Sequence, residues 1–106
     1  MSKSELETIA SEQLVTATGG FSASDMPADA SWIMQHESGG RTNARNPTSS
    51  AFGAFQMLRA TRQQYMGGNA SSTDLGAQYQ GATKYVNQRY GGWTGARRFW
   101  QGHHWY

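Results

Sequence analysis

The sequence predicts an all-α, mostly helical protein, a single small domain of about five helices. Apolar residues recur at three- and four-residue spacing in several windows, as one face of a helix requires. No stretch sustains the alternation of apolar and polar residues that is typical of a strand. Pairs of glycines follow the periodic windows and stop helices there. A chain of 106 residues has room for one modest core, so a second domain is not expected.

The first helix is predicted over residues 4–18, where apolar side chains fall on one face of a 3.6-residue period. Ser4 and Glu7 match a capping box, in which the serine oxygen and the glutamate satisfy free N–H groups at the helix start. Gly19-Gly20 ends this helix, because glycine readily adopts the left-handed conformation that follows a last turn.

A loop is expected at residues 21–26, and a second helix from near Pro27 to Ser38, because proline is tolerated in a first turn. The core-facing stripe of this helix consists of Ala30, Ile33, Met34 and Glu37. Burial among apolar neighbours and the negative end of the helix dipole both raise the pKa of such a carboxyl. It then stays protonated near neutral pH, as a general acid requires. The alternative is a solvated glutamate in a fraying last turn.

The middle of the chain is predicted to hold a loop, a short apolar stretch and a helix. Residues 41–50 are polar and read as a loop, and residues 51–57 are the apolar stretch. Gly53 in that stretch permits a ligand to approach the backbone closely, or it serves a tight turn. The helix is expected over residues 60–66, stopped by Gly67-Gly68.

The last third of the chain is predicted to hold two helices. The longer one is capped by Thr73 or Asp74 and runs to about Tyr90. Its apolar stripe consists of Leu75, Tyr79, Ala82, Val86 and Tyr90. The shorter one is capped by Thr94 and ended by Gly102. It carries Ala96, Phe99 and Trp100.

Charge is distributed unevenly along the chain. Residues 1–40 hold one lysine against six carboxylates, a net charge of −5, whereas residues 41–106 hold eight Lys and Arg against Asp74, a net charge of +7. So basic a segment indicates an anionic polymer as partner, either nucleic acid or an acidic surface glycan. The alternative is that the arginines only solvate helix faces.

Several classes of site find no support in the sequence. There is no cysteine, so a thiol nucleophile and a thiolate metal site are excluded. Three histidines are present, but no Gly-x-Ser-x-Gly elbow accompanies them. The acids are too few for a carboxylate metal site, and no glycine-rich phosphate loop occurs. We therefore expect neither a metal nor another cofactor. No membrane span and no signal peptide are expected either.

The scarcity of carboxylates makes Glu37 stand out. From Ile33 to the end of the chain, Asp74 is the only other acidic side chain. Cleavage of a glycosidic bond usually needs two carboxyl groups about 5–9.5 Å apart. Here the second would have to be Asp74, Asp25 or Asp29. This shortage favours a chemistry that needs a single acid/base.

Two motifs carry a resemblance to known families. Ile33-Met-Gln-His-Glu-Ser-Gly-Gly40, followed by Asn46-Pro-Thr-Ser-Ser-Ala-Phe-Gly-Ala-Phe-Gln-Met57, resembles the signature of lysozyme-like lytic transglycosylases. Residues 85–106 are similar to the end of lactobacillar aggregation-promoting factors, which are secreted wall proteins that carry such a domain. The resemblance covers residues 28–106, which we take as the domain, whereas residues 1–27 match no family and have no assigned role.

The resemblance implies a lysozyme-like fold that acts on the glycan strands of peptidoglycan, outside the cell or in the cell wall. Glu37 would protonate the glycosidic oxygen between N-acetylmuramic acid and N-acetylglucosamine, and then deprotonate the muramic C6 hydroxyl to close a 1,6-anhydro ring. The tyrosine that the family places near the acid has several candidate positions here. The implied substrate-binding residues are Ser50, Gly53, Gln56, Tyr85, Tyr90 and Trp100, with Phe99 a further candidate for the tyrosine's place.

Two alternatives to a transglycosylase stay open. One is a muramidase on the same fold, in which Asp74 or an earlier aspartate positions water. The other is a wall-binding or aggregation module without catalysis, held by Arg and Trp side chains. In every case we expect a monomer whose partners are peptidoglycan strands and other anionic wall polymers, and we do not expect nucleic acid.

Overall fold

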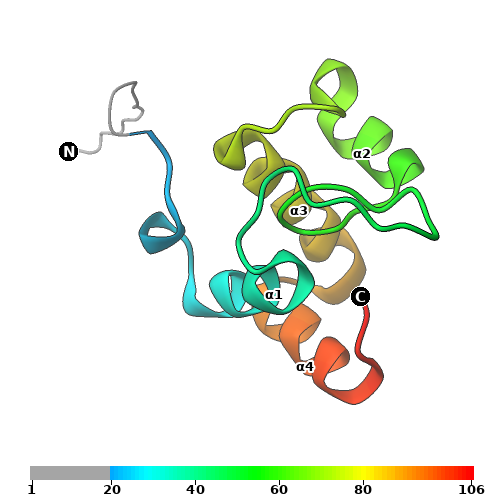
Figure 1. Ribbon diagram of the computed structural model, residues 1–106. Coiled ribbons are helices and arrows are strands. Elements are labelled where there is room, and N and C mark those ends of the chain that lie inside the picture. The colour runs from blue at the N-terminus through cyan, green and yellow to red at the C-terminus, as the bar shows by residue number, and fades with distance from the viewer. Residues whose placement is uncertain (1–19) are drawn as a thin grey trace.

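The computed structural model describes residues 20–106 (Figure 1). The helix predicted over residues 4–18, with its capping box, lies outside the described residues. Within residues 20–106 the regular structure is helical, and the only β-type pairing is two isolated bridges, from Phe52 to Arg45 and to Met57. The all-α prediction is therefore confirmed for the part of the chain that the structure describes.

Four α-helices and two 3-10 turns follow one another in the described residues. The α-helices are α1 (Ala28–Ser38), α2 (Arg59–Met66), α3 (Leu75–Tyr90) and α4 (Trp93–His103). The 3-10 turns are η1 (Ala23–Asp25), inside the stretch predicted as a loop, and η2 (Gly67–Asn69). All four α-helices were predicted, with ends within a residue or two of those observed. None of them is long and apolar enough to cross a membrane.

The core lies where α1, α3, α4 and the segment at 51–57 meet. α1 packs on α4, α4 on α3, and α3 on α2 (Figure 1). The largest fully buried side chains are Phe55, Ile33, Met34 and Val86. The predicted inward stripe of α1 is confirmed, since Ala30, Ile33 and Met34 are at most 2% exposed. Before α1, Met26 is buried and Phe21 stacks on Tyr79 at 5.0 Å, so these residues join the same core.

The ends of α3 follow the predicted capping, whereas those of α4 do not. Asp74 caps α3, because its Oδ2 accepts the N–H of Ala77 at 2.9 Å. The prediction that Thr94 caps α4 is wrong: Gly92 holds that position, and the Thr94 hydroxyl donates to Asp29 at 2.7 Å instead. A carboxylate acceptor on α1 thus competes successfully for this hydroxyl.

The prediction that Gly102 ends α4 is also wrong. The last helical residue is His103, and the C-cap that follows it, His104, has a left-handed φ of 64°. The His103 ring stacks on Phe99 one turn earlier at 3.9 Å, which stabilises the additional residue. Glycine inside a helix costs only about 1 kcal/mol, so this contact can offset it.

A buried side chain of α3, Gln78, helps to fix the long connection between α1 and α2. Its Oε1 accepts the N–H of Ala54 at 3.0 Å, and its Nε2 donates to the carbonyls of Thr42 and Ser72, both at 2.8 Å. A Cβ added at Gly53 would lie 2.7 Å from Nε2 of Gln78, and Gly53 has a φ of 90°. Glycine is therefore required here by the turn and by close packing against α3.

Candidate active site

The end of α1 places Glu37 through the residues that follow it. Gly39 adopts the left-handed conformation with a φ of 66°, and its N–H donates to the carbonyl of Gln35 at 3.0 Å. The buried hydroxyl of Ser38 donates to the carbonyl of Ala54 at 2.8 Å and accepts the N–H of Gly40 at 3.1 Å. The Glu-Ser-Gly-Gly sequence therefore terminates the helix and ties its end to the apolar segment at 51–57.

The carboxyl of Glu37 is half-buried and, among residues 20–106, accepts one hydrogen bond from another side chain. Trp100 of α4 donates its indole N–H to Oε2 at 2.6 Å. Burial raises the pKa of Glu37, while the Trp100 hydrogen bond and the nearby His36 lower it, and the balance is a pKa above the usual value of 4.5. Because Oε2 is occupied by the indole, Oε1 is the oxygen left to carry a proton.

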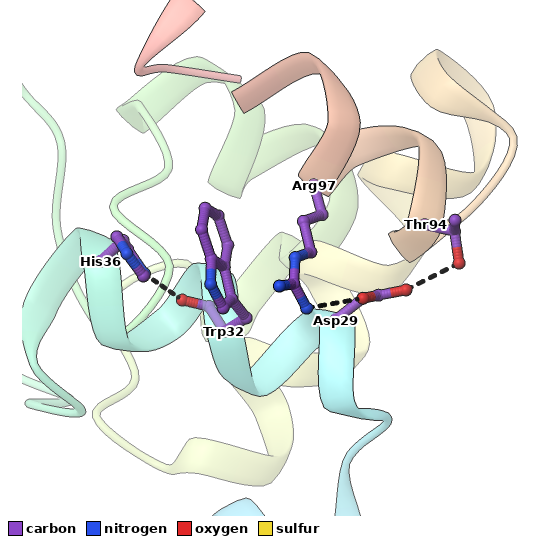
Figure 2. Close-up of polar contacts among 5 residues, drawn as sticks. All are labelled: Asp29, Trp32, His36, Thr94 and Arg97. Carbon is purple, nitrogen blue, oxygen red and sulfur yellow. Dashed lines mark hydrogen bonds and ion pairs between the residues drawn. The ribbon is translucent and has the colours of Figure 1, made fainter. Parts of the chain in front are cut away.

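Aromatic rings from α1 and α4 pack together beside the acid. Trp32 and His36 stack at 3.8 Å between ring centres, and the edge of Trp100 contacts them at 5.2 and 5.0 Å. Arg97 covers the other face of Trp32 at 4.5 Å, so this tryptophan lies between His36 and Arg97 (Figure 2). The carbonyl of Trp32 also contacts Nδ1 of His36 at 2.8 Å (Figure 2). These contacts leave neither face of Trp32 free to stack on a sugar.

The same face of α1 is joined to α4 by polar contacts. Asp29 accepts hydrogen bonds from Thr94 at 2.7 Å and from Arg97 at 3.1 Å (Figure 2). The Thr94 hydrogen bond in particular, and then Arg97, hold the pKa of Asp29 below its usual value of 3.8, against a smaller opposing effect of burial. This carboxylate therefore stays ionised and fixes the helix that carries Glu37 against the helix that carries Trp100.

Tyr106, the last residue of the sequence, lies close enough to the acid for the charge of Glu37 to act on its pKa. Its hydroxyl donates to the carbonyl of Phe55 at 2.7 Å. Burial raises its pKa well above the usual value, and the negative charge of Glu37 raises it further. Its ring lies 5.7 Å from that of Tyr85 and 6.5 Å from that of Tyr90. Sequence reasoning did not select Tyr106 as a site residue, because it follows the last helix and so belongs to no periodic pattern.

Tyr106 also lines a cavity of about 160 Å³. Two predicted residues, Gln56 and Tyr85, line the same cavity, as do Arg89 and Trp105. Trp105 is 50% exposed, which is unusual for so large an apolar side chain. The cavity thus combines aromatic walls with a few polar groups, as small-molecule sites commonly do.

The predicted site residues do not all lie together. Glu37 contacts Trp100, and Gln56 lies with Tyr85 in the cavity that Tyr106 shares. The side-chain amide of Gln56 donates to the carbonyls of Ala44 and Gly53, so its N–H groups hold the loop.

Three further predicted residues have visible structural roles. Gly53 is packed against α3, as described above. The Ser50 hydroxyl accepts the N–H of Arg59 at 3.0 Å at the start of α2, and Ser50 lines a different pocket. The Tyr90 hydroxyl is buried without a hydrogen-bond partner among the described residues, and burial above all raises its pKa to about 12.

The other carboxylates of residues 20–106 already serve the fold. Asp25 accepts the N–H of Ser22, Asp29 holds α4, and Asp74 caps α3. None of them is among the charges that shift the pKa of Glu37. No three His, Asp or Glu side chains of this part of the chain come together as metal ligands would.

Compared with protein-family models, with curated proteins and with solved structures, the chain gives no significant match.

Proposed function

We propose that this protein is a lytic transglycosylase that cleaves the glycan strands of peptidoglycan, with Glu37 as its single acid/base. The observation that carries the proposal is the environment of Glu37. Burial raises its pKa, and it accepts a hydrogen bond from Trp100, whose ring packs against Trp32 and His36. The other carboxyls of this part of the chain have structural partners.

The chemistry follows from the two oxygens of this carboxyl. Oε2 accepts the indole N–H of Trp100, so protonated Glu37 carries its proton on Oε1 and donates it to the glycosidic oxygen. The bond to the muramic C1 breaks, and N-acetylglucosamine leaves with that proton. The carboxylate so formed removes the proton from the muramic C6 hydroxyl while the oxygen of that hydroxyl attacks C1. A 1,6-anhydro ring closes, Glu37 is protonated again, and no water is consumed.

Trp100 supports the first of these steps, because its indole N–H donates to Oε2 and stabilises the carboxylate that forms when the proton leaves. Tyr106 adds no negative charge near the acid, since burial and the charge of Glu37 raise the pKa of its phenol, which donates to the carbonyl of Phe55. As part of the same proposal, the enzyme acts at the cell wall or outside the cell.

The test replaces Glu37 with glutamine. Gln keeps an oxygen that can accept the Trp100 N–H, but it has no proton to donate, so release of muropeptides from purified peptidoglycan should fall by at least about a thousandfold. Asp74→Asn is the matched control, because asparagine also caps helices well and the same charge is removed. Muropeptide release by a folded Glu37→Gln variant would refute the proposed role.

The same control separates the transglycosylase from a muramidase. If Asp74 positioned a water molecule, Asp74→Asn would lose activity and the products of the parent would carry reducing ends. The proposal expects Asp74→Asn to keep its activity. It also expects 1,6-anhydro ends, which mass spectrometry distinguishes because each lacks one water relative to the hydrolysis product.

A further inference from the structure

A second cavity, of about 280 Å³, lies between α2 and the loop that precedes it. Three arginines line it, Arg45, Arg59 and Arg62, together with hydroxyl and amide groups from Ser49, Ser71 and Asn46. It shares no lining residue with the cavity beside Tyr106. No acidic side chain is among its lining residues. Positive charge is therefore concentrated in a hollow that the proposed mechanism does not use.

Arg62 forms the buried wall of this cavity. The residue is 9% exposed, and its guanidinium donates to the carbonyls of Met57, Ala70 and Ser50 at 2.7–3.0 Å. Carbonyls satisfy its N–H groups but do not neutralise its charge, and no carboxylate of residues 20–106 forms an ion pair with it. Burial lowers its pKa most, and the positive charges of Arg59 and Arg45 lower it further, so these two arginines lie close enough to act on it.

Arg45 and Arg59 form the outer wall of the cavity and are exposed. The guanidinium of Arg45 lies 4.9 Å from the centre of the Phe52 ring, and that of Arg62 lies 5.3 Å from the same ring. Phe52 thus orients two cations toward one space. Neither Arg45 nor Arg59 makes a side-chain hydrogen bond within the described residues, so their donors face solvent. A site with three guanidinium groups is ready for an anion rather than for a neutral sugar.

The set of donors indicates a phosphate group. Guanidinium groups bind the oxygens of phosphate in pairs, and serine hydroxyls and an asparagine amide supply further donors at a tetrahedral anion. The start of α2, where Arg59 lies, adds the positive end of a helix dipole. Phosphodiester groups repeat along anionic wall polymers. Such a polymer also suits the net charge of +7 on residues 41–106, from eight Lys and Arg against one Asp.

We propose that the Arg45–Arg59–Arg62 cavity is a phosphodiester-binding site that docks this protein on an anionic, phosphate-containing polymer of the cell wall. The choice of a wall polymer rests on the proposed function, whereas the phosphate site rests on the cavity alone. Docking at this cavity leaves Glu37 and the cavity beside Tyr106 free for the glycan strand, because none of their residues lines it.

The experiment measures binding of poly(glycerol phosphate), which contains no glycosidic bond to cleave, by calorimetry at low salt. The variant is Arg45→Gln with Arg59→Gln, because Arg62 holds the fold through three carbonyls. The control is Lys84→Gln with Arg98→Gln, which removes the same charge from exposed positions on α3 and α4. We expect binding at least about tenfold weaker in the variant and within about twofold of wild type in the control.

The Glu37→Gln protein serves as the second comparison and should bind the polymer like the wild type. A wild-type protein that binds the polymer but does not cleave peptidoglycan would therefore refute the proposed function and leave the phosphate site standing. Equal weakening in both double variants would refute the site, since attraction would then be spread over the surface. Tighter binding of a DNA oligonucleotide than of poly(glycerol phosphate) would refute the choice of polymer.

Intact walls distinguish phosphate from the carboxylates of peptidoglycan. We expect wild-type protein to sediment with walls that carry their phosphodiester polymers and to lose most of this binding after those polymers are removed chemically. Undiminished binding to the stripped walls, still dependent on Arg45 and Arg59, would overturn the proposal in favour of a carboxylate ligand.

Discussion

The carboxyl of Glu37 depends on Trp100 for its orientation. The residues are 63 positions apart in the sequence, yet the indole N–H lies 2.6 Å from Oε2. Burial raises the pKa of Glu37 and this hydrogen bond lowers it, so the two effects oppose each other. Trp100 thus keeps the acid from becoming too weak to give up its proton.

Replacing Trp100 with phenylalanine tests that opposition. An aromatic ring is kept while the N–H is lost, so the pKa of Glu37 should rise further, because a hydrogen bond to its charged form is removed. Titration of the Glu37 carboxyl carbon by NMR measures the change. Trp105→Phe, at a half-exposed position, is the control and should leave that pKa in place. A pKa that stayed constant or fell in Trp100→Phe would contradict the role given to the indole.

The buried hydroxyl of Tyr90 leads to a prediction about stability. It has no hydrogen-bond partner among the described residues, so the fold carries a desolvation cost without a compensating bond. Tyr90→Phe should therefore keep or raise the free energy of unfolding, by up to about 1 kcal/mol. Tyr106→Phe, which removes a hydroxyl bonded to Phe55, should lower it by about 1 kcal/mol. Urea denaturation of both variants measures the difference, and a clear loss of stability in Tyr90→Phe would show that its hydroxyl has a partner.

At the scale of elements, the helices were predictable and the connection between α1 and α2 was not. Apolar spacing and glycine pairs are local signals, and they placed four helices and the inward face of α1. The shape of the loop depends instead on Gln78, which is a polar residue on a helix and carries no sequence signal for this role. Only the fold reveals that its amide joins Thr42, Ala54 and Ser72.

Gln78→Leu should therefore destabilise the protein strongly. Three backbone groups would lose their partner in a buried place, which costs about 3 kcal/mol or more in the free energy of unfolding. Gln80→Leu, at an exposed position of the same helix, is the control and should change it by less than about 0.5 kcal/mol. Thermal or urea denaturation measures both. Similar stability in the two variants would mean that the loop is held by other contacts.

At the scale of the whole molecule, two carboxyls give stability opposite dependences on pH. Asp29 has a lowered pKa, so its contribution is present above the usual value of 3.8 and is lost as pH falls through the pKa in the fold. Glu37 has a raised pKa, so its contribution is present below the usual value of 4.5 and is lost as pH rises through the pKa in the fold. These two groups together favour greatest stability in mildly acidic solution.

Variants separate the two contributions. Glu37→Gln has no carboxyl to ionise, so it does not lose stability as Glu37 does when pH rises. Its free energy of unfolding should therefore increase relative to that of the wild type as pH rises from about 4 to 7. Asp29→Asn should be less stable than the wild type at neutral pH, and the difference should shrink as pH falls below 3.8. Urea denaturation over a pH series measures both. Parallel curves for wild type and Glu37→Gln would contradict a raised pKa at Glu37.

The sequence by itself determined the helices, the inward face of α1 and the selection of Glu37, because apolar period, glycine pairs and scarcity of acids are all properties of the chain read locally. Only the tertiary structure decided which groups surround that acid. Trp100 and Tyr106 reach the site through contacts that span 63 and 51 residues. The three arginines of the second cavity likewise come together only when α2 packs beside its preceding loop. Such convergence depends on how elements pack, and packing of distant segments has no local period in a sequence.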